Sequence, residues 1–550
     1  MPGGLLNIVS TGNNNLFLTG NPSKTFFKVT YSKYSNFGLQ KFRIDYDGLR
    51  ELRPTEPSTF KFKMPRYADL LMDTYIVFRL PDIWSPIYPQ LDDDNRITWS
   101  PYEFKWIENI GSQIIKEIVI TCGSLTLQRY TGEYMAAMVD RDFSSEKKDL
   151  FNRMTGNVPE LNDPGYSFGR RNAYPNAPYT TSSLGAEPSI RGRDLYIPIN
   201  TWFTLNSQCA FPMIALQYNE LEISITLRPI NELFTIRDVI DVANSYPYIQ
   251  PDFNLPHFQM HRFLQTPYSP YLDNYDTSGN VINTWNADVH LLSTYCFLSK
   301  EETNVFTSQD QVYIVKDVFE HKFENITGTK KIQLNSNGMI ANWMWYLQRN
   351  DVNLRNEWNN YTNWPYKRLP SNITLASHGG FVGYPTLSYG IHPKTAQNSG
   401  ITISGDYHNE NKKEILETMG ILFNGEYREN ILTRGVYDYI EKYVRTSGNG
   451  KEGLYCYNFG LKTSPFEYQP SGAINLSTFN RIELEITTHV PSVDTVSSSF
   501  NVICGLDGSI EGIDKTNWRL YEYNYNLVLY EERYNILSFV GGNCGMMHSR

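Results

Sequence analysis

The stretch YNELEISITL at residues 218–227 alternates between polar and apolar side chains from Glu220 onward. Its apolar side chains occupy every second position and are Leu221, Ile223, Ile225 and Leu227. Successive side chains of a β-strand point to opposite faces, so this alternation predicts a strand with one buried and one solvated face. Half-buried strands of this kind are typical of antiparallel sheets. The stretch therefore favours a fold built from antiparallel strands.

A second stretch, FNRIELEIT at residues 479–487, is similar to the first. It is identical to YNELEISIT at four of nine positions and begins 261 residues later in a chain of 550. TFKFKM at residues 59–64 and NYNLVLY at residues 524–530 alternate in the same way. A repeat spaced at about half the length of the chain indicates two copies of one fold in tandem.

Helical periodicity is rare in this sequence. It occurs at residues 144–154, 412–420 and 436–444. Strand patterns dominate elsewhere, and tyrosine and other aromatic residues, which favour strands, make up 14% of the chain. The sequence therefore predicts an all-β protein with long inter-strand loops and a few short helices.

Two long segments rich in Gly, Pro, Asn and Ser interrupt the strands, at residues 141–192 and 348–412. Loops of this length are uncommon and are usually functional or without fixed structure. Prolines cluster at residues 247–256, where we expect the break between the two copies. The predicted organisation is an N-terminal arm at 1–24, a first domain at 25–246, and a second domain at 247–550 that carries the insertion 348–412.

Composition and charge narrow the class of protein. The net charge of −9 argues against a general nucleic-acid binder, although residues 1–66 carry ten basic and four acidic side chains. The six cysteines include no C-x-x-C pair, which argues against a zinc ribbon or a redox pair and fits a reducing compartment. No signal-peptide pattern and no apolar run long enough to cross a bilayer occur. We expect a soluble protein made in the cytosol.

Catalytic motifs are weak. GYSFG at residues 165–169 offers Ser167 as a nucleophile, but its Gly- and Pro-rich setting favours a chance match in a turn. His257 and His261 have the spacing of two metal ligands on a helix, yet nearby prolines disfavour a helix. The glutamate pairs of the strands fit a solvated face better than a glycosidase site. We expect no enzyme activity, no metal and no cofactor.

Sequons for N-glycosylation occur at four asparagines, which are Asn325, Asn360, Asn372 and Asn475. This number is close to chance for a chain of this size. We retain Asn325, Asn360 and Asn372 as candidate attachment sites, because Asn360 and Asn372 lie in the long loop at 348–412.

Several segments together resemble the major capsid proteins of nucleocytoplasmic large DNA viruses. GGLLNIVSTGNNNLFLTGNPSKTFFKVTYSKYSNF at residues 3–37 is similar to the family's glycine-led arm, LTGNP-like turn and TFFK strand. LYCYNFGLKTSPFEYQPSGAINLS at residues 454–477 is similar to its QPSG-x-N-x-S segment. The other similar segments, in chain order, are residues 106–135, 195–223, 421–429 and 521–547. The chain departs from the family pattern at residues 200–203 and 463–466, and its loop at 348–412 is longer than that of a minimal member.

The resemblance implies two tandem eight-stranded antiparallel jelly-roll sandwiches in each chain. It implies that three copies form a pseudo-hexagonal capsomer and that capsomers tile the icosahedral shell of a large DNA virus. Expected partners are other copies of the chain, minor capsid and penton proteins, and an inner membrane layer, with no direct contact to nucleic acid. Expected localisation is the capsid shell of the virion, with synthesis and assembly in the host cytoplasm.

The N-terminal arm would then lie at the base of the capsomer. Its apolar side chains have no evident partner within the chain, so they form a candidate assembly element; they are Leu5, Leu6, Ile8 and Val9. An alternative reading is a carbohydrate-binding jelly-roll attachment protein, in which Trp358 and Trp364 stack on sugars. A jelly-roll glycosidase that uses two of the strand glutamates is a further alternative.

Overall fold

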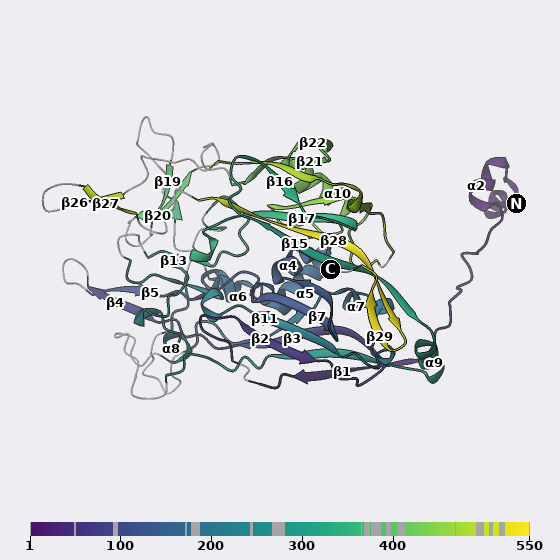
Figure 1. Ribbon diagram of the computed structural model, residues 1–550, viewed down its shortest axis with the longest axis horizontal. Coiled ribbons are helices and arrows are strands. Elements are labelled where there is room, and N and C mark those ends of the chain that lie inside the picture. Colours follow the sequence, from purple (N-terminus) through teal and green to yellow (C-terminus); the bar gives the residue numbers. More distant parts are fainter. Residues whose placement is uncertain are drawn as a thin grey trace.

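The computed structural model describes sixteen segments of the chain: residues 2–48, 51–91, 97–170, 173–177, 187–241, 246–266, 281–364, 366–367, 374–375, 387–391, 398–404, 413–467, 469–490, 500–504, 510–515 and 523–548. Within these segments the strands form two β-sandwiches, which lie one above the other in Figure 1. We call them roll 1 and roll 2 in chain order.

Roll 1 consists of two antiparallel sheets. The first contains, in spatial order, β1 (Phe37–Asp45), β14 (His290–Leu298), β3 (Leu70–Leu80) and β10 (Phe211–Pro212), with β9 (Arg193–Pro198) also paired to β3. The second contains β2 (Ser58–Lys63), β11 (Leu221–Leu227), β7 (Ile115–Cys122) and β8 (Leu125–Tyr130). The predicted strand at 218–227 is therefore β11, and its Leu221, Ile223, Ile225 and Leu227 are all buried.

Roll 2 repeats this arrangement. Its first sheet contains β15 (Gln311–Phe323), β28 (Tyr525–Val540), β17 (Met339–Arg349) and β23 (Leu454–Asn458), with β24 (Ile474–Asn475) and β29 (Asn543–Met546) paired to β17 and β28. Its second sheet contains β16 (Thr329–Leu334), β25 (Ile482–Thr488), β21 (Leu416–Phe423) and β22 (Glu426–Thr433). The repeated stretch at 479–487 forms β25, which has the same place in its sheet as β11 in roll 1. The double jelly roll expected from the sequence is confirmed.

Shorter strands and helices lie in the connections between these sheets. The additional strands are β4 (Ile87–Leu91), β5 (Ile97–Pro101), β6 (Lys105–Trp106), β12 (Phe234–Arg237), β13 (Tyr248–Ile249), β18 (Thr374–Leu375), β19 (Leu387–Ile391), β20 (Asn398–Ser404), β26 (Phe500–Cys504) and β27 (Ile510–Lys515). The α-helices are α1 (Gly3–Val9), α2 (Leu16–Thr19), α3 (Ile110–Gln113), α4 (Gly132–Asp142), α5 (Ser145–Thr155), α6 (Pro159–Asn162), α7 (Trp202–Leu205), α8 (His261–Leu264), α9 (Lys300–Ser308) and α10 (Glu441–Arg445). Single turns of tighter or wider helix are η1 (Asn13–Asn15), η2 (Pro164–Gly169), η3 (Ser207–Cys209), η4 (Met213–Ala215), η5 (Ile230–Glu232), η6 (Pro256–Phe258), η7 (Val352–Arg355), η9 (Val436–Ile440) and η10 (Leu476–Thr478).

Two of the three predicted helices are confirmed, as α5 and as η9 with α10. The helix predicted at 412–420 is wrong, because residues 416–423 form β21. The spacing of Ile415 and Met419 imitates a helical period. However, β21 pairs with β25 on one side and β22 on the other, and these ladders determine its conformation.

The sheet pairing also bears on where the two copies divide. Strand β14 pairs with β1 along its whole length and with β3 on its other side. Roll 1 therefore uses residues up to 298, beyond the expected end of the first domain at residue 246. The proline cluster at 247–256 lies within the long connection between β11 and β14, where proline is tolerated because no ladder hydrogen bond is needed.

The rolls share one continuous hydrophobic core across their junction. Roll 2 has its own interior, which includes Trp343, Trp345 and Leu484. The opposite face of its first sheet, with Met344, Tyr346 and Tyr530 among its residues, is buried in the core cluster of roll 1. Helices α4 and α5 lie between the two sandwiches (Figure 1). The two rolls are thus packed as one unit.

The two ends of the molecule differ. The hairpins β4–β5, β19–β20 and β26–β27 lie together at the left end of Figure 1. Helix α9 and the N-terminal segment lie at the opposite end, and that segment extends away from the body of the molecule. The arm and the hairpins are therefore separated by the full length of the two rolls.

Candidate functional site

The residues that sequence motifs offered as catalytic groups have structural roles. Ser167 is buried in η2, where its hydroxyl donates to the Pro164 carbonyl oxygen over 2.9 Å and accepts from Arg170 over 3.1 Å. No strand leads directly into a helix at this turn, as a nucleophile elbow requires. His257 lies in η6 with its ring 5.1 Å from that of Tyr88, and His261 begins α8. Among the described residues, no three His, Cys, Asp or Glu side chains are grouped so that they could hold a metal.

The strand glutamates are engaged in ion pairs and hydrogen bonds. Glu220 lies 3.2 Å from Lys63 across the sheet. Glu485 accepts from the Tyr427 hydroxyl over 2.8 Å, and Glu483 pairs with Arg481 over 2.7 Å. These contacts stabilise neighbouring strands. The expected solvated face is found at Glu220, whereas Glu483 is only 7% exposed.

Of the two tryptophans proposed to stack on sugars, Trp358 already contacts other residues of the chain. The Trp358 indole donates to the Glu232 carbonyl oxygen over 3.0 Å, and the Arg228 guanidinium lies 4.3 Å from its ring centre. Trp358 thereby fixes the start of the 348–412 segment against roll 1. This segment begins at the junction of the two rolls, and not on an open surface.

The sequons differ in accessibility. Asn360 is fully buried; its amide nitrogen donates to the Trp364 carbonyl oxygen over 2.8 Å, and its amide oxygen accepts from Thr362. An acceptor asparagine needs a free amide nitrogen, so the expectation of a sugar at Asn360 is not supported by this geometry. Asn325 is exposed at a turn with φ of 59°. Asn372 lies outside the described residues.

The N-terminal arm is exposed to solvent along its described length. Leu5, Leu6, Ile8 and Val9 lie in α1 and are 47–69% exposed. Phe26 and Phe27, further along, are completely exposed. A short helix with apolar side chains on its surface gains little stability by itself. The arm is therefore a segment whose apolar side chains are not buried by the described residues of its own chain.

A network of buried charges connects the rolls. The Arg141 guanidinium, at the end of α4, contacts Asp142 and Glu532, each over 2.7 Å, and donates to the Asn342 amide oxygen over 2.9 Å. Tyr134, on the same helix, donates to Glu532 over 2.8 Å. Glu532 and Asn342 belong to β28 and β17 of roll 2. The network therefore fixes helix α4 of roll 1 to the central strands of roll 2.

The local sequence explains the placement of α4. Thr131 is its N-cap, and the Thr131 hydroxyl accepts from the Tyr134 backbone N–H over 3.3 Å. Gly132 permits the close approach of the helix to the preceding chain, because a Cβ there would lie 1.9 Å from the Ser112 carbonyl oxygen. Two further backbone bonds join the end of the helix to roll 2, from the N–H groups of Gly448 and Gly450.

The ionisation of Glu532 reflects this network. Burial raises its pKa, but the positive charges of Arg141 and Lys316 and the hydrogen bond from Asn342 outweigh burial and bring the pKa to about 2. Burial also raises the pKa of Asp142, and Arg141 only partly offsets this. Glu532 is therefore the carboxylate that the network stabilises most strongly in its charged form.

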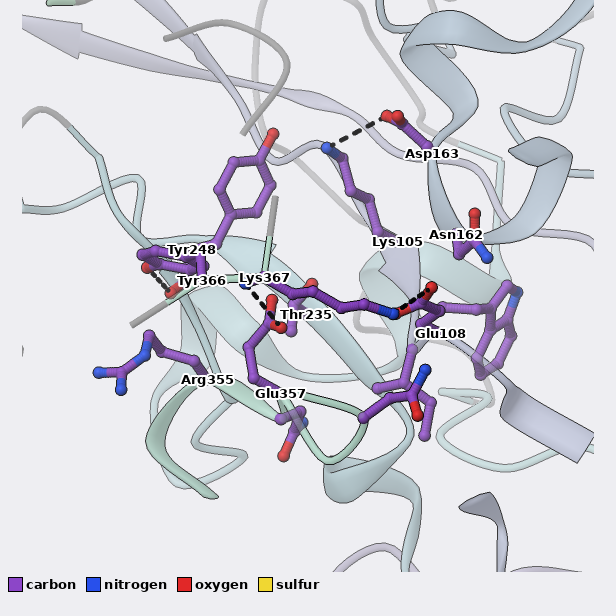
Figure 2. A pocket seen from close by; sticks show the side chains of 14 residues that line it. Lys105, Glu108, Asn162, Asp163, Thr235, Tyr248, Arg355, Glu357, Tyr366 and Lys367 are labelled. Atoms are coloured by element: carbon purple, nitrogen blue, oxygen red, sulfur yellow. Dashed lines mark hydrogen bonds and ion pairs between the residues drawn. The ribbon is translucent and has the colours of Figure 1, made fainter. Parts of the chain in front are cut away.

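A small cavity of about 120 Å³ lies at a second point of the junction (Figure 2). Lys105 on β6 approaches Asp163 to 3.7 Å, and Lys367 contacts Glu108 over 2.8 Å. The Tyr366 hydroxyl donates to the Tyr248 carbonyl oxygen over 2.8 Å. The labelled side chains come from both rolls, so the cavity marks the place where segment 352–367 of roll 2 meets the loops of roll 1.

The charges around this cavity are largely balanced by one another. Burial together with the nearby Glu108 raises the pKa of Glu357 to about 7. Burial lowers the pKa of Lys105, and the charges of Glu103 and Asp163 partly restore it. Three basic and three acidic side chains line the cavity, which are Lys105, Arg355, Lys367, Glu108, Asp163 and Glu357. The arrangement fits a structural contact between the two rolls better than a catalytic centre.

Sequence reasoning missed these junction residues. A signal was present in β28, where the charged residues Glu531, Glu532 and Arg533 stand together in the middle of a largely buried strand of 16 residues. Charged pairs inside a buried strand indicate buried partners. The partners themselves, such as Arg141, lie hundreds of residues away and have no local pattern.

Comparison with known proteins divides the chain into two parts that correspond approximately to roll 1 and roll 2. Residues 25–282 match a family described as the major capsid protein N-terminus, and residues 302–545 match a family described as the large eukaryotic DNA virus major capsid protein. The major capsid protein of Phaeocystis pouchetii virus is 22% identical over 591 aligned residues, which cover 98% of this chain and 99% of that protein. The major capsid protein of Paramecium bursaria Chlorella virus 1 is 22% identical over the full length of both chains.

Solved structures show the same fold. The PBCV-1 VP54 structure aligns with a TM-score of 0.59 at 17% identity and covers 96% of this chain and 100% of that one. The Faustovirus major capsid protein aligns with a TM-score of 0.59 at 12% identity and covers 97% and 96% of the two chains. Within the described residues, no helix is long and apolar enough to cross a membrane.

Proposed function

The chain belongs to the major capsid proteins of large eukaryotic DNA viruses, and we propose that three copies of it associate into one pseudo-hexagonal capsomer. Its role is structural, in the capsid shell of the virion, and its family is not enzymatic. The observation that carries the proposal is the duplication of the jelly roll within one chain. Three chains with two similar rolls each give six similar blocks around one axis, which suits a closed ring with heterologous contacts.

The arm is the proposed assembly element. Leu5, Leu6, Ile8 and Val9 extend from the body and lack cover within the chain. Complete burial of four such side chains is worth about 6 to 12 kcal/mol, at about 1.5 to 3 kcal/mol each. Ordering of the flexible segment offsets part of this gain, so the arm becomes fixed only when a lattice supplies cover. Cover would come from a neighbouring capsomer, a minor capsid or penton protein, or an inner membrane layer.

The orientation of the capsomer follows from the two ends of the molecule. The arm and the hairpins β4–β5 and β19–β20 lie at opposite ends (Figure 1). If the arm faces the particle interior, these hairpins face outward. The exposed Asn325 stays a proposed site of glycosylation, and synthesis and assembly are proposed for the host cytoplasm. We place the division between the rolls at α9, which separates the last strand of roll 1 from the first strand of roll 2.

The oligomeric state tests this proposal. The cysteines whose side chains the structure describes are free thiols; they are Cys122, Cys209, Cys296, Cys456 and Cys544. The assembly should therefore persist under reducing conditions. Native mass spectrometry of the purified protein with reductant should give a mass of three chains. A protein that stays monomeric at all accessible concentrations would refute the capsomer proposal.

A further inference from the structure

We infer that the surface formed by β22, η9 and α10 on roll 2 docks onto the outer face of the β1–β14–β3 sheet on roll 1 of a second copy. This inference rests on the proposed homotrimer and names the surfaces that hold it together. We call the first surface the helix face and the second the sheet face.

The junction within one chain provides the template. There, β8 of roll 1 and the helix that follows it, α4, pack against the first sheet of roll 2. The Gln128 side chain on β8 donates to the Lys316 carbonyl oxygen on β15 over 3.3 Å. Tyr134 on α4 contacts Tyr530 on β28, with ring centres 5.3 Å apart. One strand–helix unit of roll 1 thus covers the outer face of one sheet of roll 2.

The same strand–helix unit recurs in roll 2 without cover. Strand β22 corresponds to β8, because each is the last strand in its four-stranded sheet. Each is followed by a helix, α4 after β8 and η9 with α10 after β22. Most residues of helix α4 are buried, whereas in the helix of roll 2 only Tyr437, Asp438 and Lys442 are buried.

The outward side of the helix face is apolar. Its exposed large side chains are Tyr427, Ile431, Tyr439, Ile440, Tyr443 and Val444, and Tyr443 is 92% exposed. Tyr427 and Ile431 lie side by side, since both approach the position of a Cβ on Gly420 to within 3.3 Å. Exposed aromatic and aliphatic side chains gathered on one strand–helix unit are typical of a protein interface, where tyrosine is enriched.

The sheet face is the matching surface of roll 1. The equivalent face of roll 2 is buried under α4, whereas on roll 1 the outward side chains of Leu39 and Tyr196 are 53% and 41% exposed. A hollow of about 580 Å³ lies on this face, with Val77 and Leu292 in its lining. The charged groups around the hollow include an ion pair between Arg43 and Asp288 at 2.7 Å. The face therefore combines a depression with apolar contacts and fixed charges.

The positions of the two faces suit a closed ring. In Figure 1 the sheet with β1 lies at the bottom of the molecule, and β22 and α10 lie at the top. The helix face and the sheet face are different surfaces, so contact between them is heterologous and leaves one free face at each end of a dimer. If the contact between roll 1 and roll 2 within a chain is repeated between chains, each roll has one neighbour at its strand–helix unit and another at the outer face of its first sheet. A ring of three chains leaves neither face uncovered.

Single charge substitutions on each face test the inference. Tyr443→Glu places a carboxylate on the helix face, and Leu39→Glu places one on the sheet face. Both residues are exposed in the single chain, so the fold of the monomer should be retained, as checked by circular dichroism. In native mass spectrometry across a dilution series, each variant should require a protein concentration about 30-fold higher or more to form the trimer. The matched control is Tyr218→Glu, which replaces a tyrosine 74% exposed outside both faces and should trimerise like the unsubstituted chain.

A mixture of the two variants tests the heterologous geometry. Tyr443→Glu retains an intact sheet face, and Leu39→Glu retains an intact helix face. One intact interface can therefore form between them, and the mixture should contain 1:1 heterodimers that neither variant forms alone.

Three results would overturn the inference: trimers of either variant with unchanged midpoint, equal weakening by Tyr218→Glu, or a mixture without heterodimers. These failures are distinct from failure of the capsomer proposal, in which the unsubstituted chain itself does not trimerise. If Leu39→Glu trimerises normally and impairs only particle formation, the sheet face binds another component of the shell and the inference is also wrong.

Discussion

Replacement of Glu532 by glutamine should weaken the junction between the two rolls. Glu532 accepts from Arg141, Tyr134 and Asn342 at the same time. Glutamine keeps the shape of the side chain but removes its charge. In either orientation its amide NH₂ faces a donor, so at least one hydrogen bond is lost and its donor stays buried.

The magnitude follows from the ionisation of this carboxylate. The junction lowers the pKa of Glu532 from 4.5 to about 2, and one pKa unit corresponds to about 1.36 kcal/mol. The charged form is therefore favoured by about 3 kcal/mol, and we expect Glu532→Gln to lose about this much stability at pH 7. With an unfolding entropy of about 2.1 cal/mol/K per residue, the melting temperature of the 550-residue chain should fall by about 2 to 3 °C.

The pH dependence gives a second signature. A carboxylate whose folded pKa is depressed stabilises the fold above its ordinary pKa and loses this contribution as the pH falls. The difference in melting temperature between the variant and the unsubstituted chain should have its largest value above about pH 5. It should become smaller as the pH falls from 4.5 towards 2. Differential scanning calorimetry over this range measures it. Glu467→Gln is the control, because the pair of Glu467 with Lys462 is about half exposed and should contribute little. A loss at pH 7 no larger than that of the control, or a difference independent of pH, would refute the reasoning.

The remaining predictions concern the cavity, the arm, a sequon and the orientation. Burial raises the pKa of Glu357 to about 7, so its ionisation costs stability as the pH rises from about 4.5 to above 7; Glu357→Gln should raise stability by about 3 kcal/mol at pH 8 and leave it unchanged at pH 4.5, as measured by melting at both values. Deletion of residues 2–17 should leave trimer formation and melting temperature unchanged but abolish particle assembly, seen by native mass spectrometry and electron microscopy; a lower melting temperature would make the arm part of the fold. Asn360→Ala should cost about 1 to 3 kcal/mol through lost buried hydrogen bonds, whereas Asn325→Ala should change stability little; a mass loss of one sugar chain in the Asn360 variant would contradict this. An antibody against residues 387–404 should bind intact particles and one against residues 2–18 should not, and the reverse pattern would invert the proposed orientation.

Much of the fold was predictable because its strands are half-buried. The alternation in β11 and β25 follows directly from burial of one face, and their similarity revealed the duplication. That β14 belongs to the first sheet of roll 1 was not predictable by this route, because His290–Leu298 reads HLLSTYCFL, with no strict alternation. Ser293 and Thr294 in its centre are buried together with Tyr295 and Cys296, so burial in this strand does not follow the polarity of its side chains. The proline cluster at 247–256, from which the boundary was expected, lies within the long connection between β11 and β14.

The junction was the least predictable feature. Arg141 and Glu532 come together only because α4 packs on β28, and no local pattern encodes such a distant contact. The same limit applies to Asn360, whose sequon is readable from three residues while its burial depends on the packing of the whole 352–367 segment. The exposed arm, in contrast, was predictable, since its apolar residues lack an alternating pattern long enough to complete either roll, although helix α1 within it was not predicted.

A cryo-electron microscopy map of the shell of assembled particles tests the central claim most directly. The account predicts a repeating block of three chains with six jelly rolls, in which the β22–α10 surface of each chain lies on the β1–β14–β3 sheet of the next and the N-terminal arm lies on the inner side. A shell whose repeating block has another backbone, or a block in which the rolls of different chains do not touch through these surfaces, would contradict it.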